Sequence, residues 1–308
     1  MSLPKIYTDE NAARRHLEKL QWPDGPVCPH CGVVDEATKL EGKSTRPGVY
    51  KCRPCQKPFS VTVGTVFEDS HVPLHKWLYA AHLLTASKKG ISSHQLHRTL
   101  GVTYKTAWFM SHRIREAMRP AELTPMGGTG QTVELDETYV GRLEGQPRRG
   151  RRGGASHKNT VMTLVERGGS ARTFHISGTT LATLLPIIRT NIRRESNLMT
   201  DQAAWYKYIG KEFASHGTVE HSADEYVRRE GERSIHTNTV EGYYSIFKRG
   251  MKGIYQHCSE KHLHRYLSEY DFRYSYRVRL GYDDAMRADK ALQGIRGKRL
   301  TYRGPHAA

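Results

Sequence analysis

Two closely spaced cysteine pairs limit how the first part of this chain can fold. The sequence contains Cys28-Pro-His-Cys31 and, after a gap of twenty residues, Cys52-Arg-Pro-Cys55. Four thiolates at this spacing suit a tetrahedral zinc ion held between two hairpins. A redox dithiol needs only one such pair, so we expect a structural zinc ribbon over residues 25–66. So small a ribbon lacks a core of its own, and the zinc ion would supply its folding free energy.

The charge of the chain favours a polyanion as its partner. Among 308 residues, 48 are Lys or Arg and 31 are Asp or Glu, which gives a net charge of +17. Such a field favours nucleic acid first and an acidic membrane surface second. No run approaches the ~20 apolar residues of a membrane span, and the N-terminus has no apolar signal segment. We therefore expect a cytoplasmic protein, whose reduced thiols are more suited to metal ligation than to disulfides.

Residues 72–119 have the pattern of a helix-turn-helix. A short helix starts near Ser92, the chain turns at Gly101, and a second helix capped by Thr103 follows. One face of the second helix is apolar, and we expect three other residues to be available to a DNA groove: Lys105, His112 and Arg113. Helix pairs of this kind also occur as plain scaffold, so a structural role stays open. Residues 1–24 hold a short amphipathic helix that we assign to packing.

A new domain follows a linker at residues 120–130 that is rich in Pro, Gly and Thr. Its first segment, VELDETYVG at residues 133–141, alternates apolar and polar residues and predicts a strand that ends in carboxylates. A hairpin, a helix and a strand leading into Asp201 come next, which favours a mixed α/β core. We expect Glu134 and Glu137, which flank the aspartate of the first strand, to face the opposite side as surface or supporting groups.

The segment at residues 142–158 is strongly basic. It contains five Arg and one Lys against a single Glu and shows no apolar period. It predicts a solvated, mobile loop in the free protein and a phosphate clamp that orders on DNA, and the two roles are compatible. The arginines expected to contact phosphates are Arg148, Arg149, Arg151 and Arg152.

A third acidic segment, HTNTVEGYYSIFKRG at residues 236–250, has helical periodicity. Glu241 and Lys248 lie two turns apart on one face, and Arg249 follows. This layout suits a metal ion and a DNA phosphate held side by side. Glu241 also occupies a position typical of a helix-capping acid, so a purely structural role for it stays open. Phosphodiester chemistry is promoted by two divalent ions about 3.5–4 Å apart, and Mg²⁺ prefers carboxylate oxygens.

Taken together, these segments resemble the ISXO2-like transposases of bacterial insertion sequences. The resemblance is carried by the cysteine pairs, the helix-turn-helix, LDETYVG, MTDQAAWY and the long run that starts at HTNTVEGYYSIFKRG, and it covers most of residues 25–280. It implies a DDE transposase with a ribonuclease-H-like core. It also implies catalytic carboxylates at Asp136, Asp201 and Glu241, and a basic residue seven places further on, at Lys248. Some members carry Asn as the third ligand.

The sequence leaves some points open. Asn238 lies one turn before Glu241, and the spacing to Lys248 favours Glu241 as the third ligand. The expected catalytic domain spans residues 131–280, with Mg²⁺ or Mn²⁺ at its site, and residues 281–308 are expected to be a basic tail. DNA is the expected partner, and pairing of two element ends would need a homo-oligomer. A DNA-binding regulator with an inactive core and a site-specific nuclease that cuts without joining remain alternatives.

Overall fold

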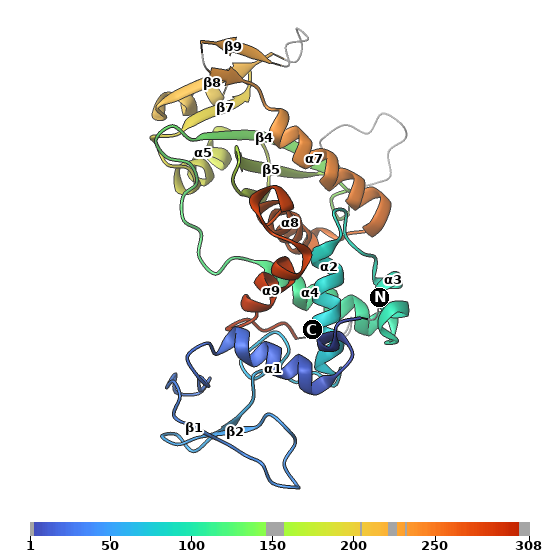
Figure 1. The fold of residues 1–308 in the computed structure, drawn as a ribbon. Helices are drawn as coiled ribbons and strands as arrows, with labels where there is room; N and C mark the ends of the chain where they lie inside the picture. Colours follow the sequence, from blue (N-terminus) through green and yellow to red (C-terminus); the bar gives the residue numbers. More distant parts are fainter. Residues whose placement is uncertain (1–2, 146–156, 204, 221–226, 232, 302–308) are drawn as a thin grey trace. The chain divides into compact units, whose positions relative to one another are not determined.

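The computed structural model describes residues 3–145, 157–203, 205–220, 227–231 and 233–301. The chain forms two compact units, of which the first comprises residues 1–120 with 283–308 and the second residues 121–282 (Figure 1). The boundary at Pro120 falls where the predicted linker begins.

The first unit contains a small antiparallel sheet that carries part of the cysteine cluster. Its strands are β1 (Ala37–Lys39), β2 (Tyr50–Cys52) and β3 (Pro58–Phe59), in the order β1-β2-β3. The side chains of Trp22, Tyr50 and Phe59 pack edge-on or stacked against one another beside the cysteines. Without the metal, this apolar cluster is small, which agrees with a ribbon that depends on its ion.

Helices make up the rest of the first unit. A single 3₁₀ turn (Lys5–Tyr7) precedes α1, and the helices are α1 (Glu10–Gln21), α2 (Leu74–Ala86), α3 (Ser93–Leu100), α4 (Tyr104–Met118) and α9 (Asp284–Gln293). The side chains of Ser92 and Thr103 accept hydrogen bonds from the first turns of α3 and α4. Gly101 ends α3 with φ +60°, a left-handed conformation that suits glycine. The predicted helix, turn and helix are therefore confirmed as local structure.

The C-terminal segment is not the basic tail that we expected from the sequence. Residues 284–293 form α9, and Ala288, Ala291, Leu292 and Ile295 are buried against the first unit. The apolar positions are few and small, so their periodicity is weak in the sequence. The described part of the C-terminus, up to residue 301, is therefore part of the helical core of the first unit.

The second unit is built on a five-stranded mixed sheet. Its strands are β4 (Thr132–Val140), β5 (Asn159–Glu166), β6 (Ala171–Ile176), β7 (Asn197–Asp201) and β8 (Ser215–Val219), in the order β6-β5-β4-β7-β8. Strand β5 pairs in antiparallel fashion with both β6 and β4. Strand β7 pairs in parallel fashion with both β4 and β8. A separate ladder pairs β9 (Arg228–Glu230) with β10 (Arg233–Ile235).

Helices cover both faces of this sheet (Figure 1). The helices of one face are α5 (Leu181–Asn191) and α6 (Tyr206–Ile209), and those of the other are α7 (Asn238–Gly250) and α8 (Glu260–Ser275). The remaining turns are Gly210–Glu212, Met251–Tyr255 and Val278–Leu280. Val133 and Leu135 of β4 pack toward α5, so the alternate residues of β4 face α7. The acids of β4 therefore divide between two environments.

Candidate active site

Strands β4 and β7 bring Asp136 and Asp201 to the same edge of the sheet. The two strands are parallel, and Glu134 is the register partner of Met199. Continuing this register by two residues aligns Asp136 with Asp201, the last residue of β7. Equivalent positions on parallel neighbours point to the same face of a sheet. Two of the three predicted acids thus lie on adjacent strands, on the face that α7 covers.

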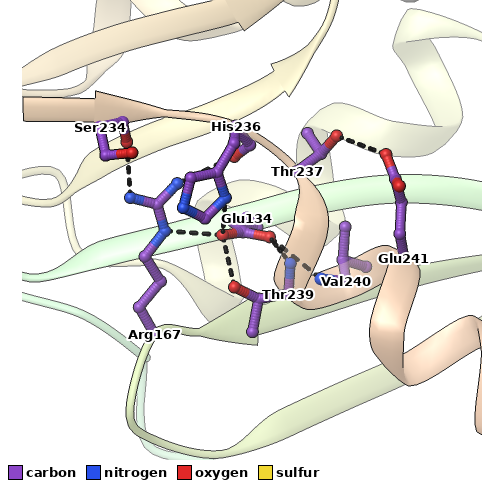
Figure 2. Close-up of polar contacts among 8 residues, drawn as sticks. All are labelled: Glu134, Arg167, Ser234, His236, Thr237, Thr239, Val240 and Glu241. Carbon is purple, nitrogen blue, oxygen red and sulfur yellow. Dashed lines mark hydrogen bonds and ion pairs between the residues drawn. The ribbon is translucent and has the colours of Figure 1, made fainter. Parts of the chain in front are cut away.

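Helix α7 brings the third predicted acid, Glu241, to this edge. Tyr244, one turn further along the helix, donates a hydrogen bond from its hydroxyl to the main-chain oxygen of Asp136 at 2.6 Å. The hydroxyl of Thr237 donates to Oε1 of Glu241 at 3.0 Å (Figure 2). The helix is thereby tied to β4 at the position of Asp136, and Glu241 is oriented from the residue that precedes the helix.

The pKa of Asp136 is raised by burial and by the charges of the neighbouring acids. Burial is the largest cause that raises this pKa, from its ordinary 3.8 to about 7, and the charge of Glu137 is the next cause that raises it. The charges of Asp201 and Glu241 raise it further, whereas the hydrogen bond from the Glu137 backbone N–H opposes the rise. The three predicted carboxylates therefore share one electrostatic environment.

A fourth acid, Glu137, lies on the opposite face of β4, as the sequence predicted, but its charge still acts on Asp136. Burial raises its pKa to about 7, the charge of Asp201 adds to the rise, and the hydrogen bond from Tyr206 opposes it. The hydroxyl of Tyr206, a fully buried residue of α6, is the donor of that bond. Glu137 and Tyr206 were not identified as a pair because their contact joins two elements far apart in the sequence.

Our prediction that Glu134 faces away from Asp136 is wrong, because residues two apart in a strand lie on the same face. Two residues before Asp136, it lies on the same face, and its exposed fraction is 0%. Its carboxylate contacts Arg167, His236 and the first turn of α7 (Figure 2). The period of two within the strand was the signal that could have identified it.

The basic residues predicted on α7 are exposed. The amine of Lys248 lies 5.8 Å from the centre of the Tyr244 ring, and Tyr244 in turn contacts Asp136. Arg249 folds back along the helix, where its Nη2 donates to the Ser245 hydroxyl at 2.8 Å. Lys248 is thus positioned on the side of α7 that carries Glu241, as the helical spacing predicted.

Asn238, the alternative third ligand, lines a pocket on another side of α7. It borders a pocket of about 490 Å³ together with Arg167, His236, Arg277 and Arg279. The arc of α7 that faces this pocket includes Thr239, Gly242 and Tyr243. Glu241 and Lys248 lie on another arc of the helix. The structure therefore favours Glu241 over Asn238 as the residue that faces Asp136.

The acid group has the ligand chemistry of a magnesium site. Carboxylate oxygens are the hard ligands that Mg²⁺ prefers, and the mutual repulsion recorded in the pKa of Asp136 would be relieved by a divalent cation. Among the described residues, only the cysteine cluster brings three or more ligand atoms within 4.8 Å of one another. Acids that serve two ions about 3.5–4 Å apart do not have to converge so closely. The chemistry of these acids therefore suits divalent cations.

The four cysteines form a closed group suited to zinc. Their sulfur atoms all lie within 4.8 Å of one another, and two Sγ–Sγ distances, Cys28 to Cys55 and Cys31 to Cys52, are 3.6 Å. A tetrahedron with Zn–S bonds of about 2.3 Å has edges of about 3.8 Å. The predicted pairing of two knuckles around one structural zinc ion thus fits the geometry.

The residues predicted to enter a DNA groove have different environments. Lys105 is exposed at the start of α4. His112 and Arg113 have exposed fractions of 1% and 8%, so our prediction that they are available to DNA is wrong. The Arg113 guanidinium donates to the main-chain oxygens of Leu300 and Glu68, which lie far from it in the sequence. The four arginines at positions 148, 149, 151 and 152 lie outside the described residues.

Comparisons with known proteins give two family matches. Residues 127–275 match the ISXO2-like transposase domain, and residues 8–58 match the transposase zinc-ribbon domain. A protein of Halobacterium salinarum, described as an uncharacterized protein in transposable element ISH50, is 29% identical over 285 residues. The alignment covers 87% of this chain and 92% of that protein. Within the described residues, no helix is long and apolar enough to span a membrane.

Proposed function

Because the chain belongs to the ISXO2-like transposases, we propose that it binds the ends of its own insertion element and catalyses metal-dependent strand cleavage and strand transfer. The acids of this DDE reaction are Asp136, Asp201 and Glu241. The observation that carries the proposal is the placement of Asp136 and Asp201 on adjacent parallel strands, with the helix of Glu241 bonded to β4 at Asp136. The raised pKa of Asp136, caused by burial and by the charges of Glu137, Asp201 and Glu241, agrees with this placement. A buried group of like charges is costly unless a cation joins it.

The arrangement of the sheet supports a ribonuclease-H-like core. Three antiparallel strands, β6, β5 and β4, continue into two parallel strands, β7 and β8. The first acid lies on the central strand and the second at the end of the parallel neighbour. The third acid comes from a helix on one face. This order of elements and acids is the one that the family resemblance implies.

Each residue of the site has a distinct part in the proposed reaction. Asp136, Asp201 and Glu241 would hold the divalent cations. Bound Mg²⁺ would supply activation of the attacking oxygen and stabilisation of the leaving oxygen. Lys248 would contact a phosphate next to the scissile bond. Tyr244 keeps the backbone of Asp136 against α7, through the hydrogen bond of its hydroxyl.

The first unit would hold the element end. Its zinc ribbon and the helix pair α3 and α4 would recognise DNA, with Lys105 at the exposed start of α4. The net charge of +17 would bring DNA to the protein from a distance. Pairing of two ends would require two or more copies of the chain. Mn²⁺ would be an alternative to Mg²⁺ at the acids, since both take oxygen ligands.

A strand-joining assay tests the proposal. The probe is a labelled duplex that carries the terminal repeat of the element, and the acceptor is a supercoiled plasmid. With Mg²⁺, the wild-type chain should cut the labelled strand and join it to the plasmid. Asp136→Asn should bind the duplex with unchanged affinity and give neither product. Joining by Asp136→Asn would refute the assigned site.

The same assay separates the two alternatives. A site-specific nuclease would give cut product without joined product. A DNA-binding regulator with an inactive core would bind the duplex and give neither product, even as wild type. A nuclease would use the same acids, so the joined product is what separates it from a transposase. In a regulator with an inactive core, the acids around Asp136 would have no catalytic role.

A further inference from the structure

We propose that Glu134 is a positioning residue, which holds Glu241 against Asp136 by capping helix α7 from the catalytic strand. The proposal rests on the proposed function, since it concerns the position of an acid of the same site. Glu134 lies two residues before Asp136 on β4 and contacts the start of the helix that carries Glu241 (Figure 2). One side chain therefore joins the two elements that supply two of the acids.

The carboxylate of Glu134 is buried and fully engaged. Its Oε2 accepts hydrogen bonds from the backbone N–H groups of Thr239 at 2.8 Å and Val240 at 3.0 Å. Its Oε1 accepts from the Thr239 hydroxyl at 2.7 Å and from Nε of Arg167 at 2.6 Å. His236 Nδ1 lies 3.1 Å from the same oxygen. A buried carboxylate is stable only with such compensation.

The two N–H groups are those that a helix cap normally serves. Thr239 and Val240 are the second and third residues of α7, and the residue before the helix, Thr237, makes no side-chain cap bond. In most helices, the side chain at that position accepts from these same N–H groups. Glu134 takes over this role from a strand more than 100 residues away in sequence. Its negative charge also complements the positive end of the helix dipole.

This long-range cap leaves the Thr237 hydroxyl for another partner. That hydroxyl donates to Oε1 of Glu241 at 3.0 Å (Figure 2). Thr237 is buried, with an exposed fraction of 1%. Its side chain is therefore held in place while it orients the third acid. Glu134 fixes the helix, and Thr237 fixes the carboxylate on that helix.

Arg167 secures the chain that leads into α7. Besides its bond to Glu134, it donates to the main-chain oxygens of Ser234 at 2.7 Å and His236 at 2.9 Å. Arg167 follows β5, whose residue Thr163 is the register partner of Asp136. The residues around Glu134 thus connect β4 and its neighbour β5 to the entry of α7.

A glutamine at position 134 would keep the size and remove this function. It offers a single oxygen acceptor, and its Nε2 would face N–H donors instead of accepting from them. Either the backbone N–H groups of α7 or the Arg167 guanidinium would lose their partner. The same contacts also support the fold, so the experiment must separate positioning from stability.

The first experiment compares three variants in the full-length chain: Glu134→Gln, Thr237→Val and Thr237→Ser. Mn²⁺ binding is titrated by electron paramagnetic resonance, and binding that persists in Asp136→Asn is subtracted as background. Loss of a group that orients a metal ligand typically weakens binding about 10–100-fold. We expect Glu134→Gln and Thr237→Val to weaken Mn²⁺ binding by about this factor. Thr237→Ser keeps the hydroxyl and should restore wild-type binding.

A second readout and a matched control make the outcome decisive. Backbone hydrogen exchange at the start of α7 should accelerate in Glu134→Gln and not in Thr237→Val, whose capping bonds remain. Ile188→Val or Ile188→Ala, on the opposite face of the sheet, is chosen to match the melting temperature of Glu134→Gln. The control should retain wild-type Mn²⁺ binding.

Three results would overturn the proposal. These are unchanged Mn²⁺ binding in folded Glu134→Gln and Thr237→Val, equal weakening in the Ile188 control, or no rescue by Thr237→Ser. If Glu134→Gln does not fold, Glu134→Asp, which keeps the charge but shortens the side chain that reaches the N–H groups of α7, replaces it in both measurements. A wild-type chain that binds Mn²⁺ at Asp136 but neither cuts nor joins DNA would refute the proposed function and leave the positioning role intact.

Discussion

Replacing Asp136 with Asn should stabilise the metal-free protein at alkaline pH while it abolishes catalysis. The pKa of Asp136 rises from 3.8 to about 7, mainly through burial and then through the charge of Glu137. At about 1.36 kcal/mol per pKa unit, ionising this carboxyl in the folded chain costs about 4 kcal/mol more than in the unfolded chain. An amide avoids this cost and can still accept the bond from the Glu137 backbone N–H.

The effect has a defined pH window. Below about pH 4, Asp136 is protonated in both the folded and unfolded chain, so Asn and Asp should give equal stability. Between pH 4 and 7, the folded wild type retains a proton that the unfolded chain loses, so wild-type stability falls as pH rises. The advantage of Asp136→Asn should therefore grow across this window and approach about 4 kcal/mol at pH 8.

Hydrogen exchange with mass spectrometry measures this effect in the second unit alone. Peptides from β5 and α7 report its unfolding free energy, and Glu195→Gln is a control at an exposed carboxylate. Saturating Mg²⁺ should stabilise the wild type far more than Asp136→Asn, because a ligand stabilises the state that binds it. A destabilised Asp136→Asn at pH 8, or the same pH dependence in both proteins, would contradict the electrostatic reasoning.

Three further predictions concern the first unit. Chelation of zinc should open residues 25–66 to protease and leave peptides of residues 121–282 protected, and equal cleavage of both would argue against a metal-dependent ribbon. Lys105→Gln should reduce the slope of log affinity against log salt by about one. Arg113→Gln should instead lower the melting temperature and keep the salt slope, because its guanidinium bonds the oxygens of Leu300 and Glu68.

Local signals were sufficient for the parts of the fold that short segments determine. The helix start near Ser92, the turn at Gly101 and the cap at Thr103 follow from properties of single residues, and the structure confirms them. The cysteine cluster follows from spacing alone. The alternation of β4 likewise predicted a strand, which is observed at residues 132–140.

Long-range partners explain what the sequence did not reveal. Helix α4 is covered on almost every side, so His112 and Arg113 are buried although they are polar. The groups that satisfy Arg113 lie 45 and 187 residues away in the sequence. The same holds for α9, whose small apolar residues show their role only where α2 packs against them. No periodicity within one segment encodes such partners.

The acids of β4 show how charge compensation separates residues of one chemical type. Glu134 already has a cation, Arg167, and the positive end of α7, so an additional metal ion would gain little there. Within the described part of the chain, Asp136 has no ion pair, and the charged groups that act on it are other acids. Glu137 receives a neutral donor, Tyr206. Asp136 is therefore the acid that most needs an external cation. The buried Glu134, which caps the helix that bonds to β4 at Asp136, needs none.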